Sequence, residues 1–465
     1  MREWENATWA AGQSEAEVIR RVGKKIAGLA LRMSVPGDAI LILAGKGHNG
    51  GDARAAREQL PDRRVETLDI TAPENDLSKL ETALRSRPAL IIDGLFGIGL
   101  DRPLDDGWKK FIAAVNGSKI PILAVDVPSG LNADSGQPKG TAIEAAVTLT
   151  VGAPKIGMLQ PGAWPFVGRL EVAEDVGLIA CPLQSELNWT LPDDFSGVPP
   201  RRDVASHKGS FGHLAMIAGS FGFHGAAVLA ARGAQRAQPG LITLFPQEAV
   251  YHVVASQLQA VMVNVWKPET RLPESVSAIL IGPGMAAPQF AEELKTFTRR
   301  LWRRLARDSA LPMIVDASAL DWLVPHALSK NEIRIVTPHP GEAARMLGKT
   351  AQQVQANRPQ AVRELSRRFG DCWVVLKGHQ TLVGQSTGPI FVNSSGNPHL
   401  AQGGSGDVLA GFIAGLLAQP PLQADVGKTI RFAVWQHGNA ADVLQAARAN
   451  WVVEDLVAAL GRAGR

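Results

Sequence analysis

Short apolar runs alternate with longer amphipathic stretches along most of the chain, and this alternation predicts strands and helices in turn. In the first half we expect a helix at 14–33 and strands at 39–43, 89–92, 120–125 and 147–151. In the second half we expect strands at 213–219, 241–245, 278–281, 313–316, 333–339 and 373–377. Such alternation is typical of an α/β fold, in which helices cover both faces of a mostly parallel sheet and the crossovers are right-handed.

The alternation stops near residue 181, where CPLQSELNWTLPDDFSGVPPRRD is rich in Pro, Asp and Ser and shows no periodicity. A chain of 465 residues is also too long for one compact core. We therefore predict two doubly wound, three-layer domains, at 1–190 and 206–465, joined by a linker at 191–205. The two halves share no internal repeat.

Composition narrows the functional classes. The chain is 45% hydrophobic and 20% charged, and no apolar run is long enough to span a bilayer, so we expect no membrane association. The N-terminus, MREWENATWA, is polar where a secretory signal is apolar, which predicts a cytoplasmic protein. The net charge of +4 is spread along the chain, which favours anionic small molecules over nucleic acid. Cys181 and Cys372 are far apart in the sequence, and both are expected to be packing residues.

A glycine-rich turn that runs into an amphipathic helix, within 393–420, carries the strongest chemical signal. Gly403, Gly404 and Gly406 allow successive N–H groups to converge on an anion, and the helix dipole adds to their attraction. Asp407 lies in the first turn, where it either caps the helix or acts as a base towards a hydroxyl. Because the glycines exceed what a cap requires, phosphate handling is favoured. The helix is expected to bury one stripe, made of Val408, Leu409, Phe412, Ile413, Leu416 and Leu417.

A second glycine turn follows the first predicted strand. Gly45, Gly47 and Gly50 have the G-x-G-x-x-G spacing between a strand and a helix, and Asp69 ends the next strand. This pattern indicates a Rossmann-like dinucleotide site, with a simple packing turn as the alternative. No Gly-Lys-Ser/Thr follows, so the turn is not a Walker loop.

Polar residues also stand where other strands end. Asp93 and Asp126 each end an apolar segment, and with Ser129 they could share a hard cation or bind ribose hydroxyls, although aspartates also start ordinary turns. Since the carboxyl ends of parallel strands line one crevice, these loops are expected to face the same cleft. The corresponding residues of the second half are also expected to converge, and they are Gly282, Gly284, Asp316, 339–345 and 377–381.

Several motifs together carry a resemblance that spans nearly the whole chain. GKGHNGGD, DGLFGIGLDRPL and DVPSGLNADSG resemble the loops of an NAD(P)H-hydrate epimerase domain. HKGSFGHLAMIAGSFGFHGAAVLAARGAQ, TPHPGEAARML, LKGHQTLV and GNPHLAQGGSGDVLAG resemble an ADP-dependent NAD(P)H-hydrate dehydratase domain. The chain thus resembles the bifunctional NAD(P)H-hydrate repair enzymes, which implies a second domain of the ribokinase-like superfamily.

The resemblance implies roles for matching positions. In the first domain Asp126 would be catalytic, and a potassium ion would lie among Asn49, Asp93 and Ser129. The hydrated nucleotide would contact Asp126 together with His48, Asn49, Gly50, Gly51, Asp52, Gly97, Ile98, Gly99, Leu100, Asp101, Arg102 and Pro103. In the second domain the hydrate would contact Gly284, His339, Pro340, Gly341, Glu342, Ala343, Ala344, Arg345 and Asp407, with Asp407 catalytic. ADP would contact Lys377, Gly378, His379, Gln380, Thr381 and Gly406.

The implied chemistry is epimerisation of the R and S hydrates, followed by ADP-dependent phosphorylation of the ring hydroxyl and loss of phosphate, with magnesium as a further cofactor. A homo-oligomer is also expected. In the first domain IRRVGKKIAG replaces a Met-Glu-x-Ala-Gly-like stretch and His48 replaces the first residue of an Asn-Asn pair, and in the second Pro398, His399, Leu400 and Gln402 replace smaller residues beside the glycine turn. Two rival functions stay open: an NAD-dependent oxidoreductase, and a sugar or vitamin kinase fused to a nucleotide-binding module.

Overall fold

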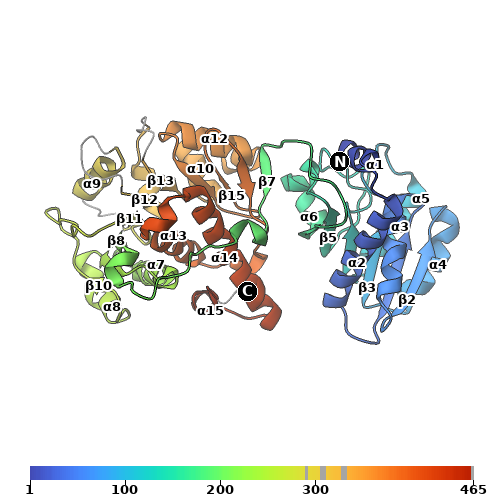
Figure 1. Cartoon of the computed structure of the whole chain (residues 1–465), viewed down its shortest axis with the longest axis horizontal. Coiled ribbons are helices and arrows are strands. Elements are labelled where there is room, and N and C mark those ends of the chain that lie inside the picture. Colours follow the sequence, from blue (N-terminus) through green and yellow to red (C-terminus); the bar gives the residue numbers. More distant parts are fainter. Residues whose placement is uncertain (288–291, 304–310, 326–331, 462–465) are drawn as a thin grey trace. The chain divides into compact units, whose positions relative to one another are not determined.

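The computed structural model describes residues 1–287, 292–303, 311–325 and 332–461, which form two compact units, Met1–Gln184 and Ser185–Arg465 (Figure 1). Each unit is a sheet covered by helices, and the α/β fold class predicted from the hydrophobic pattern is confirmed. Among the described residues, no helix is long and apolar enough to cross a membrane.

The first unit contains a six-stranded sheet in the order β2-β1-β3-β4-β5-β6, and all neighbouring strands are parallel. Its strands are β1 (Ala39–Ala44), β2 (Arg64–Asp69), β3 (Leu90–Gly94), β4 (Ile122–Val125), β5 (Val147–Val151) and β6 (Arg169–Ala173). Its main helices are α1 (Arg2–Ala10), α2 (Glu15–Arg32), α3 (His48–Ala56), α4 (Pro73–Arg85) and α5 (Asp106–Gly117). The order reverses between β1 and β3, as in other doubly wound folds.

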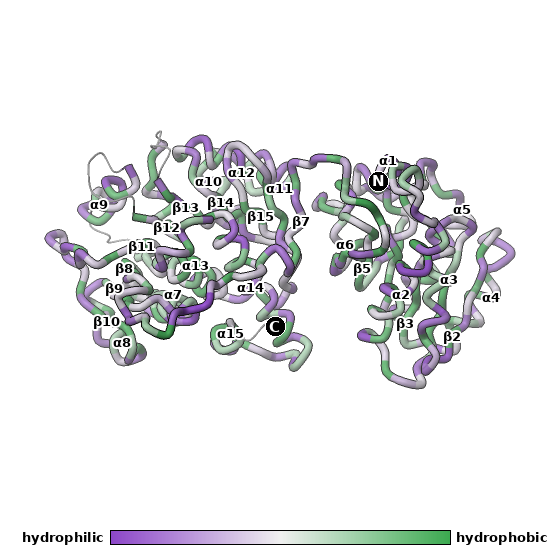
Figure 2. The backbone as a smooth tube through the Cα atoms, viewed as in Figure 1, coloured by the Kyte–Doolittle hydropathy of each residue, from purple (hydrophilic) through white to green (hydrophobic). Residues whose placement is uncertain are grey.

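Side chains of each strand point alternately to the two faces of the sheet, and helices cover both faces, which gives this unit three layers. Ile40 and Ile42 of β1 pack with α2 and α3 on one face, whereas Leu41 and Leu43 pack with α4 and α5 on the other. Ser14 caps α2 by accepting a hydrogen bond from the backbone of the first turn, as its place before an amphipathic run predicts. Along the surface helices, hydrophilic residues alternate with hydrophobic ones (Figure 2).

The second unit contains a ten-stranded sheet in the order β10-β9-β8-β11-β12-β13-β14-β15-β16-β7. The strands are β7 (Leu187–Trp189), β8 (His213–Ile217), β9 (Leu241–Phe245), β10 (Met262–Val263), β11 (Ala278–Ile281), β12 (Met313–Val315), β13 (Arg334–Val336), β14 (Trp373–Leu376), β15 (Leu382–Gly384) and β16 (Ile390–Val392). Neighbouring strands are parallel except where β15 pairs antiparallel with β14 and β16. The short strands β7, β10, β15 and β16 were not expected, because two or three residues carry no readable alternation.

Helices cover both faces of this sheet (Figure 1). One core cluster joins the sheet to α7 (His224–Ala237), α13 (Ser405–Leu417), α14 (Val426–Ala447) and α15 (Val453–Ala459). The remaining long helices are α9 (Glu292–Arg303), α10 (Pro340–Leu347) and α12 (Arg358–Arg368), and α12 packs on β14 and β15. The expectation of a single buried stripe on α13 is too narrow, because every residue from Val408 to Leu417 is buried. This helix is enclosed by α7, α14 and the sheet, so it has no solvent face.

The segment between the domains is more ordered than its composition suggests. The unit boundary falls after Gln184, ahead of the predicted end at residue 190, and β7 joins the second sheet. Within the expected linker at 191–205, Phe195 is buried and its ring packs against that of Phe432. Phe195 and the three residues of β7 are too few to produce a hydrophobic periodicity in the sequence, so this order was not predicted. Cys372 is buried as expected, but Cys181 is exposed, so its predicted packing role is wrong.

Candidate active sites

A cavity of about 680 Å³ opens in the first unit at the carboxyl ends of its strands. The loops after β1, β3 and β4 form its walls, as the strand-end argument predicts. The expected site residues that line it are His48, Asn49, Asp52, Gly97, Ile98, Gly99, Leu100, Asp101, Arg102 and Asp126. Its volume lies in the range of small-molecule sites, which is about 300–1,000 Å³.

Asp126 follows β4 in a left-handed backbone conformation, with φ of 63°. Its side chain is mostly buried, and Oδ1 accepts hydrogen bonds from the Lys155 ammonium and, at 3.0 Å, from the Val151 N–H. The Thr150 hydroxyl lies 3.3 Å from the same oxygen. A non-glycine residue in this backbone region is uncommon and costs about 1–3 kcal/mol, so the surrounding contacts hold Asp126 in place.

Further carboxylates lie close to Asp126. Burial, with the negative charges of Asp126, Glu5 and Glu15 adding to it, raises the pKa of Asp52 to about 8. Burial, followed by the charge of Asp126, also raises the pKa of Glu5. At neutral pH Asp52 therefore carries a proton, and the cavity combines an acid with an ion-paired carboxylate.

Asn49, Asp93 and Ser129 form one network, as the resemblance implied. The Ser129 hydroxyl donates to Asp93 Oδ1 at 2.6 Å, and the Ser129 N–H donates to Asp93 Oδ2 at 2.9 Å. Asn49 Nδ2 donates to the Phe96 carbonyl at 2.8 Å, and the Phe96 N–H donates to the Ser129 hydroxyl at 2.8 Å. Among the described residues, Asn49 Oδ1 is buried and has no hydrogen-bond partner. Burial raises the pKa of Asp93 to about 6, against the opposing effect of the Ser129 hydrogen bonds.

The glycine turn after β1 supports the cavity through close packing and through Arg54. A Cβ at Gly50 would lie 2.0 Å from the Gly45 carbonyl oxygen, so Gly50 is required for close packing. The Asp69 carboxylate accepts a hydrogen bond from Arg54 at 2.7 Å, and the same guanidinium donates to the Gly45 carbonyl. Asp69 thus fixes the turn through Arg54.

Both departures from the family motifs in the first domain contribute to the cavity, because Ile19 and Val22 of the IRRVGKKIAG stretch line it, as does His48. His48 Nε2 is 3.0 Å from Glu15 Oε1, and both side chains line the cavity. The first helix also contributes cavity residues that sequence reasoning missed, and they are Arg2, Glu5 and Trp9. No local pattern marks them, because α1 is brought to the loops only by folding.

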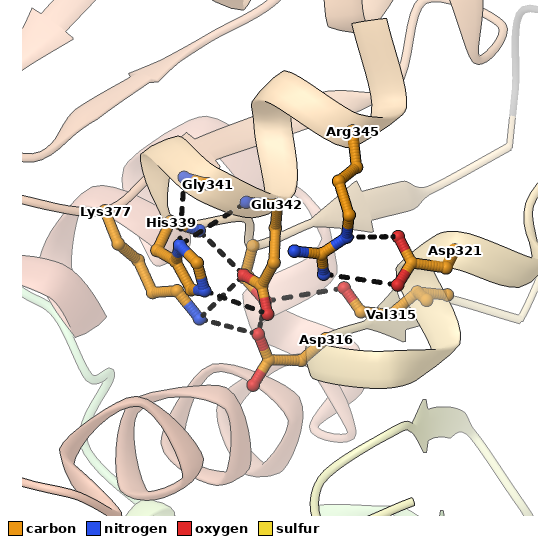
Figure 3. A network of polar contacts seen from close by, with 9 residues as sticks. Val315, Asp316, Asp321, His339, Gly341, Glu342, Arg345 and Lys377 are labelled. Carbon is orange, nitrogen blue, oxygen red and sulfur yellow. Dashed lines mark hydrogen bonds and ion pairs between the residues drawn. The ribbon is translucent and has the colours of Figure 1, made fainter. Parts of the chain in front are cut away.

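The second unit gathers its charged strand-end residues into one network (Figure 3). The Lys377 ammonium lies 2.7 Å from Asp316 Oδ1 and 3.9 Å from Glu342 Oε2. Asp316 is buried and also accepts a hydrogen bond from the Thr337 hydroxyl at 2.7 Å. Burial lowers the pKa of Lys377, but the charges of Asp316 and Glu342 more than offset this, so its pKa is raised. The lysine remains positively charged.

Asp407 and the glycine turn, at the start of α13, lie close to this network. Gly404 caps α13 with φ of 94°, where a Cβ would lie 2.4 Å from Leu229 Cδ1. A Cβ at Gly406 would lie 3.4 Å from Lys377 Nζ, so the start of the helix faces the lysine. Among the described residues, the Asp407 carboxylate caps no helix. Burial, with Asp316 and Glu342 adding and Lys377 opposing, raises the pKa of Asp407 to about 7.

The loop at 377–381, expected to contact the nucleotide, is shaped by a residue that sequence reasoning missed. Arg358 is buried, and its guanidinium donates to the carbonyls of Leu376, His379 and Gln380. Gly378 has φ of 133° and Gln380 has φ of 51°, so the loop turns sharply. The Thr381 hydroxyl donates to the Gly378 carbonyl at 3.0 Å.

The expected hydrate-binding segment at 339–345 divides into exposed and buried residues. The His339 imidazole caps α10, and the Glu342 carboxylate accepts the His339 N–H at 2.8 Å (Figure 3). Arg345 is exposed and pairs with Asp321 through two contacts of 3.1 and 3.2 Å. Ala343 and Ala344 are buried, so they pack α10 against the rest of the unit. On another loop, the Gly284 carbonyl accepts the Ser220 hydroxyl at 2.7 Å.

Lys155 is the main residue of the first site that sequence reasoning did not assign. It follows β5 in the way that Asp126 follows β4, so the strand-end argument could have found it. His437 of α14 has no such signal. Its Nε2 lies 3.0 Å from the Ser405 carbonyl, and burial lowers its pKa to about 4, so this neutral ring supports the start of α13.

Comparison with known proteins matches both halves. Residues 214–460 match the family described as NAD(P)H-hydrate dehydratase, and residues 63–157 match the family described as YjeF-related protein N-terminus. The bifunctional NAD(P)H-hydrate repair enzyme of Coxiella burnetii is 32% identical over 95% of this chain and 93% of its own length. The Gloeobacter violaceus enzyme of that name is 32% identical over 99% of this chain and 95% of its own.

Solved structures agree for the second unit. The ADP/ATP-dependent NAD(P)H-hydrate dehydratase of Bacillus subtilis, co-crystallised with ATP and Mg²⁺, has a TM-score of 0.50 and 32% identity over 57% of this chain and 92% of its own. A ribokinase-like superfamily protein of Enterococcus faecalis has a TM-score of 0.51 and 24% identity over 61% of this chain and 97% of its own, which supports the fold alone.

Proposed function

The chain belongs to the family of bifunctional NAD(P)H-hydrate repair enzymes, and we propose that its two candidate sites divide the two reactions between them. The cavity of the first unit interconverts the R and S hydrates. The Asp316–Lys377–Asp407 site of the second unit removes water from the S hydrate at the expense of a nucleotide. The observation that supports this division best is that each unit has its own largely buried aspartate–lysine pair at the carboxyl ends of its strands.

In the second site Asp407 is the base. As the ring hydroxyl attacks the terminal phosphorus of ADP, its proton passes to the Asp407 carboxylate and the phosphorus–oxygen bond to the departing nucleotide breaks. Loss of the phosphate and of a neighbouring ring proton then restores the double bond of NADH or NADPH. A pKa near 7 suits this role, because a base works best when its pKa is close to the working pH.

The nucleotide phosphates lie between Lys377 and the start of α13. The ammonium faces Gly406, and the helix N-terminus adds free N–H groups and the positive end of its dipole. Magnesium, when bound, would neutralise charge on the phosphates, with Asp316 and Glu342 as the oxygen ligands closest to the lysine. No group of three or more His, Cys, Asp or Glu in the described part of the chain suits a metal.

In the first site a potassium ion fits the residues present. The unpartnered Asn49 Oδ1, the Asp93 carboxylate and the Ser129 hydroxyl form an all-oxygen set, which suits a hard cation. Bound there, the ion would supply positive charge for an anionic substrate. The cytoplasmic location and the homo-oligomer expected from the sequence stay predictions.

Asp126 acts at the epimerising carbon. We assign inversion to a step in which the bond from that carbon to the hydroxyl oxygen breaks and water adds on the other ring face. A protonated Asp52 can protonate the departing hydroxyl, while Asp126 takes a proton from the incoming water. Both line the same cavity.

The test is recovery of NADH absorbance from a mixture of epimers, with and without ADP, together with chiral separation of the hydrates. We expect Asp126→Ala to slow interconversion on the order of a hundredfold or more, the usual loss for a base, while ADP-dependent conversion of the S hydrate stays within about twofold. Unchanged interconversion in this variant would remove Asp126 from the mechanism. A stable phosphorylated alcohol would favour the kinase, and redox change of NAD the oxidoreductase.

A further inference from the structure

We propose that Lys155 is the positioning residue of the first site, which holds Asp126 by one oxygen and presents the other to the substrate. The proposal rests on the proposed epimerase function of this cavity. It assigns Lys155 a role in orientation and charge, and no contact with the substrate.

All three ammonium protons of Lys155 have acceptors within the protein. Nζ donates to Asp126 Oδ1, to the Thr150 hydroxyl oxygen at 2.8 Å and to the Val151 carbonyl at 3.0 Å. A lysine ammonium has three donors and no acceptor, so none remains for the substrate. Lys155 is also buried, with 8% of its surface exposed. The lysine therefore acts through Asp126.

The two oxygens of Asp126 have different surroundings. Oδ1 is held by Lys155, by the Val151 N–H and by the nearby Thr150 hydroxyl. Within the described residues, Oδ2 accepts no hydrogen bond, although Asp126 lines the cavity. A carboxylate held at one oxygen points its second oxygen in one direction only. This is the geometry that a positioned base requires.

The local charge gives the lysine a second task. Glu5 and Asp52 lie near Asp126, and the negative charge of Glu5 opposes a further carboxylate. Arg2, Lys46, His48 and Arg102 also line the cavity, and the N-terminus lies near Glu5. Lys155 is the cation in direct contact with Asp126, so it compensates the charge that the base must carry.

The strained backbone adds an independent sign of positioning. Asp126 keeps φ of 63°, while its N–H donates to the Leu149 carbonyl of β5 at 2.8 Å. Lys155 and Thr150 come from the same strand and the loop that follows it. β5 thus fixes both the backbone and the side chain of Asp126, and an isolated aspartate at the end of β4 would lack this support.

The experiment compares Lys155→Met with Lys155→Arg, and Lys24→Met serves as an exposed lysine control in the same unit. For Lys155→Met we expect kcat of epimerisation to fall at least about tenfold with KM changed less than about twofold, because orientation and not binding is lost. The acidic limb of the pH–rate profile should move to higher pH. Lys155→Arg should recover part of the rate, and Lys24→Met should match the wild type.

A double variant separates positioning from general stability. In an Asp126→Ala background, Lys155→Met should slow epimerisation no further, because the lysine acts through the missing carboxylate. Equal multiplicative losses in both backgrounds, or an unshifted pH profile in Lys155→Met, would overturn the assignment. If Lys155→Met does not fold, Lys155→Arg and Thr150→Val carry the test, and wild-type rates with an unshifted pH profile in both would overturn it. An inactive wild type would overturn the proposed epimerase function as well.

Discussion

Both units contain a largely buried aspartate–lysine pair at the carboxyl ends of their strands, but the two pairs differ in which partner remains available to a ligand. In the first unit the Lys155 ammonium has three acceptors and, within the described parts of the chain, Asp126 Oδ2 accepts no hydrogen bond. In the second unit Lys377 faces the start of α13, while Asp316 is buried and held by Lys377 and Thr337. The first pair therefore presents a carboxylate, and the second presents a cation.

The difference follows from what each site must bind. Interconversion of the hydrates needs a base, and a lysine behind it compensates the charge. Phosphate transfer needs a cation towards the nucleotide, and in the proposed mechanism the second site takes its base from a separate element, at Asp407. Similar strand-end positions thus perform opposite tasks, and the neighbours of each ion pair decide which.

The largest effect is expected for Asp407→Asn, which keeps the shape but removes the base. ADP-dependent recovery of NADH from the S hydrate should fall on the order of a hundred- to ten-thousand-fold, while ADP still binds. Single-turnover absorbance and calorimetric titration with ADP measure the two effects. Asp126→Ala is the matched control, since its second site is intact. Normal turnover in Asp407→Asn would show that the second pair works without a separate base.

The pH dependence of the same carboxylate provides a further measurement. With a pKa of about 7, the dehydration rate should fall about tenfold per unit below pH 7 and level off above it. Because the pKa of Asp407 is raised, the folded protein binds more protons than the unfolded chain between pH 3.8 and about pH 7. The contribution of this carboxyl group to the free energy of unfolding therefore falls as pH rises through that window. Asp407→Asn should therefore unfold at the wild-type temperature or higher at pH 8. A lower unfolding temperature would contradict this sign.

A smaller loss is expected for Lys377→Met, which removes the cation presented by the second pair. The rate should fall on the order of a hundred- to a thousandfold, as for the loss of one charge-stabilising donor, and ADP affinity should weaken. Steady-state kinetics at varied ADP measure both quantities. Lys349→Met, on an exposed lysine paired with Glu364, should leave both unchanged. An unaltered ADP response in Lys377→Met would place the phosphates elsewhere.

The smallest effect is expected for Gly406→Ala. The added Cβ would lie 3.4 Å from Lys377 Nζ, so KM for ADP should rise by less than about tenfold, equivalent to about 1.4 kcal/mol. The helix itself should gain up to about 1 kcal/mol, because alanine favours a helix over glycine. Gly28→Ala in α2, where a Cβ meets nothing within 4 Å, should give the stability gain alone. An unchanged KM for ADP in Gly406→Ala would mean that Lys377 and the glycine turn do not both contact the nucleotide.

The alternation of apolar runs by itself determined the α/β class, most strands of both sheets and the place of each site at the strand ends. Ala39–Ala44 is a wholly apolar run, and Val147–Val151 and Leu241–Phe245 are mainly apolar with small threonines, so each is a local signal for a buried parallel strand. The motifs determined the family in the same local way. Gly404, Gly406 and Asp407 stand next to one another in the sequence, so folding had only to bring Lys377 to them.

Only the tertiary structure decided which partners meet across the chain. Glu5 of α1 reaches the cavity of Asp126, Arg358 holds the loop after β14, and Lys155 joins Asp126 from the neighbouring strand. These contacts depend on strand order and burial, which cannot be inferred from a single sequence. The pKa values of Asp52 and Asp407 were likewise decided in space, because desolvation and nearby charge act through distance and not through sequence separation.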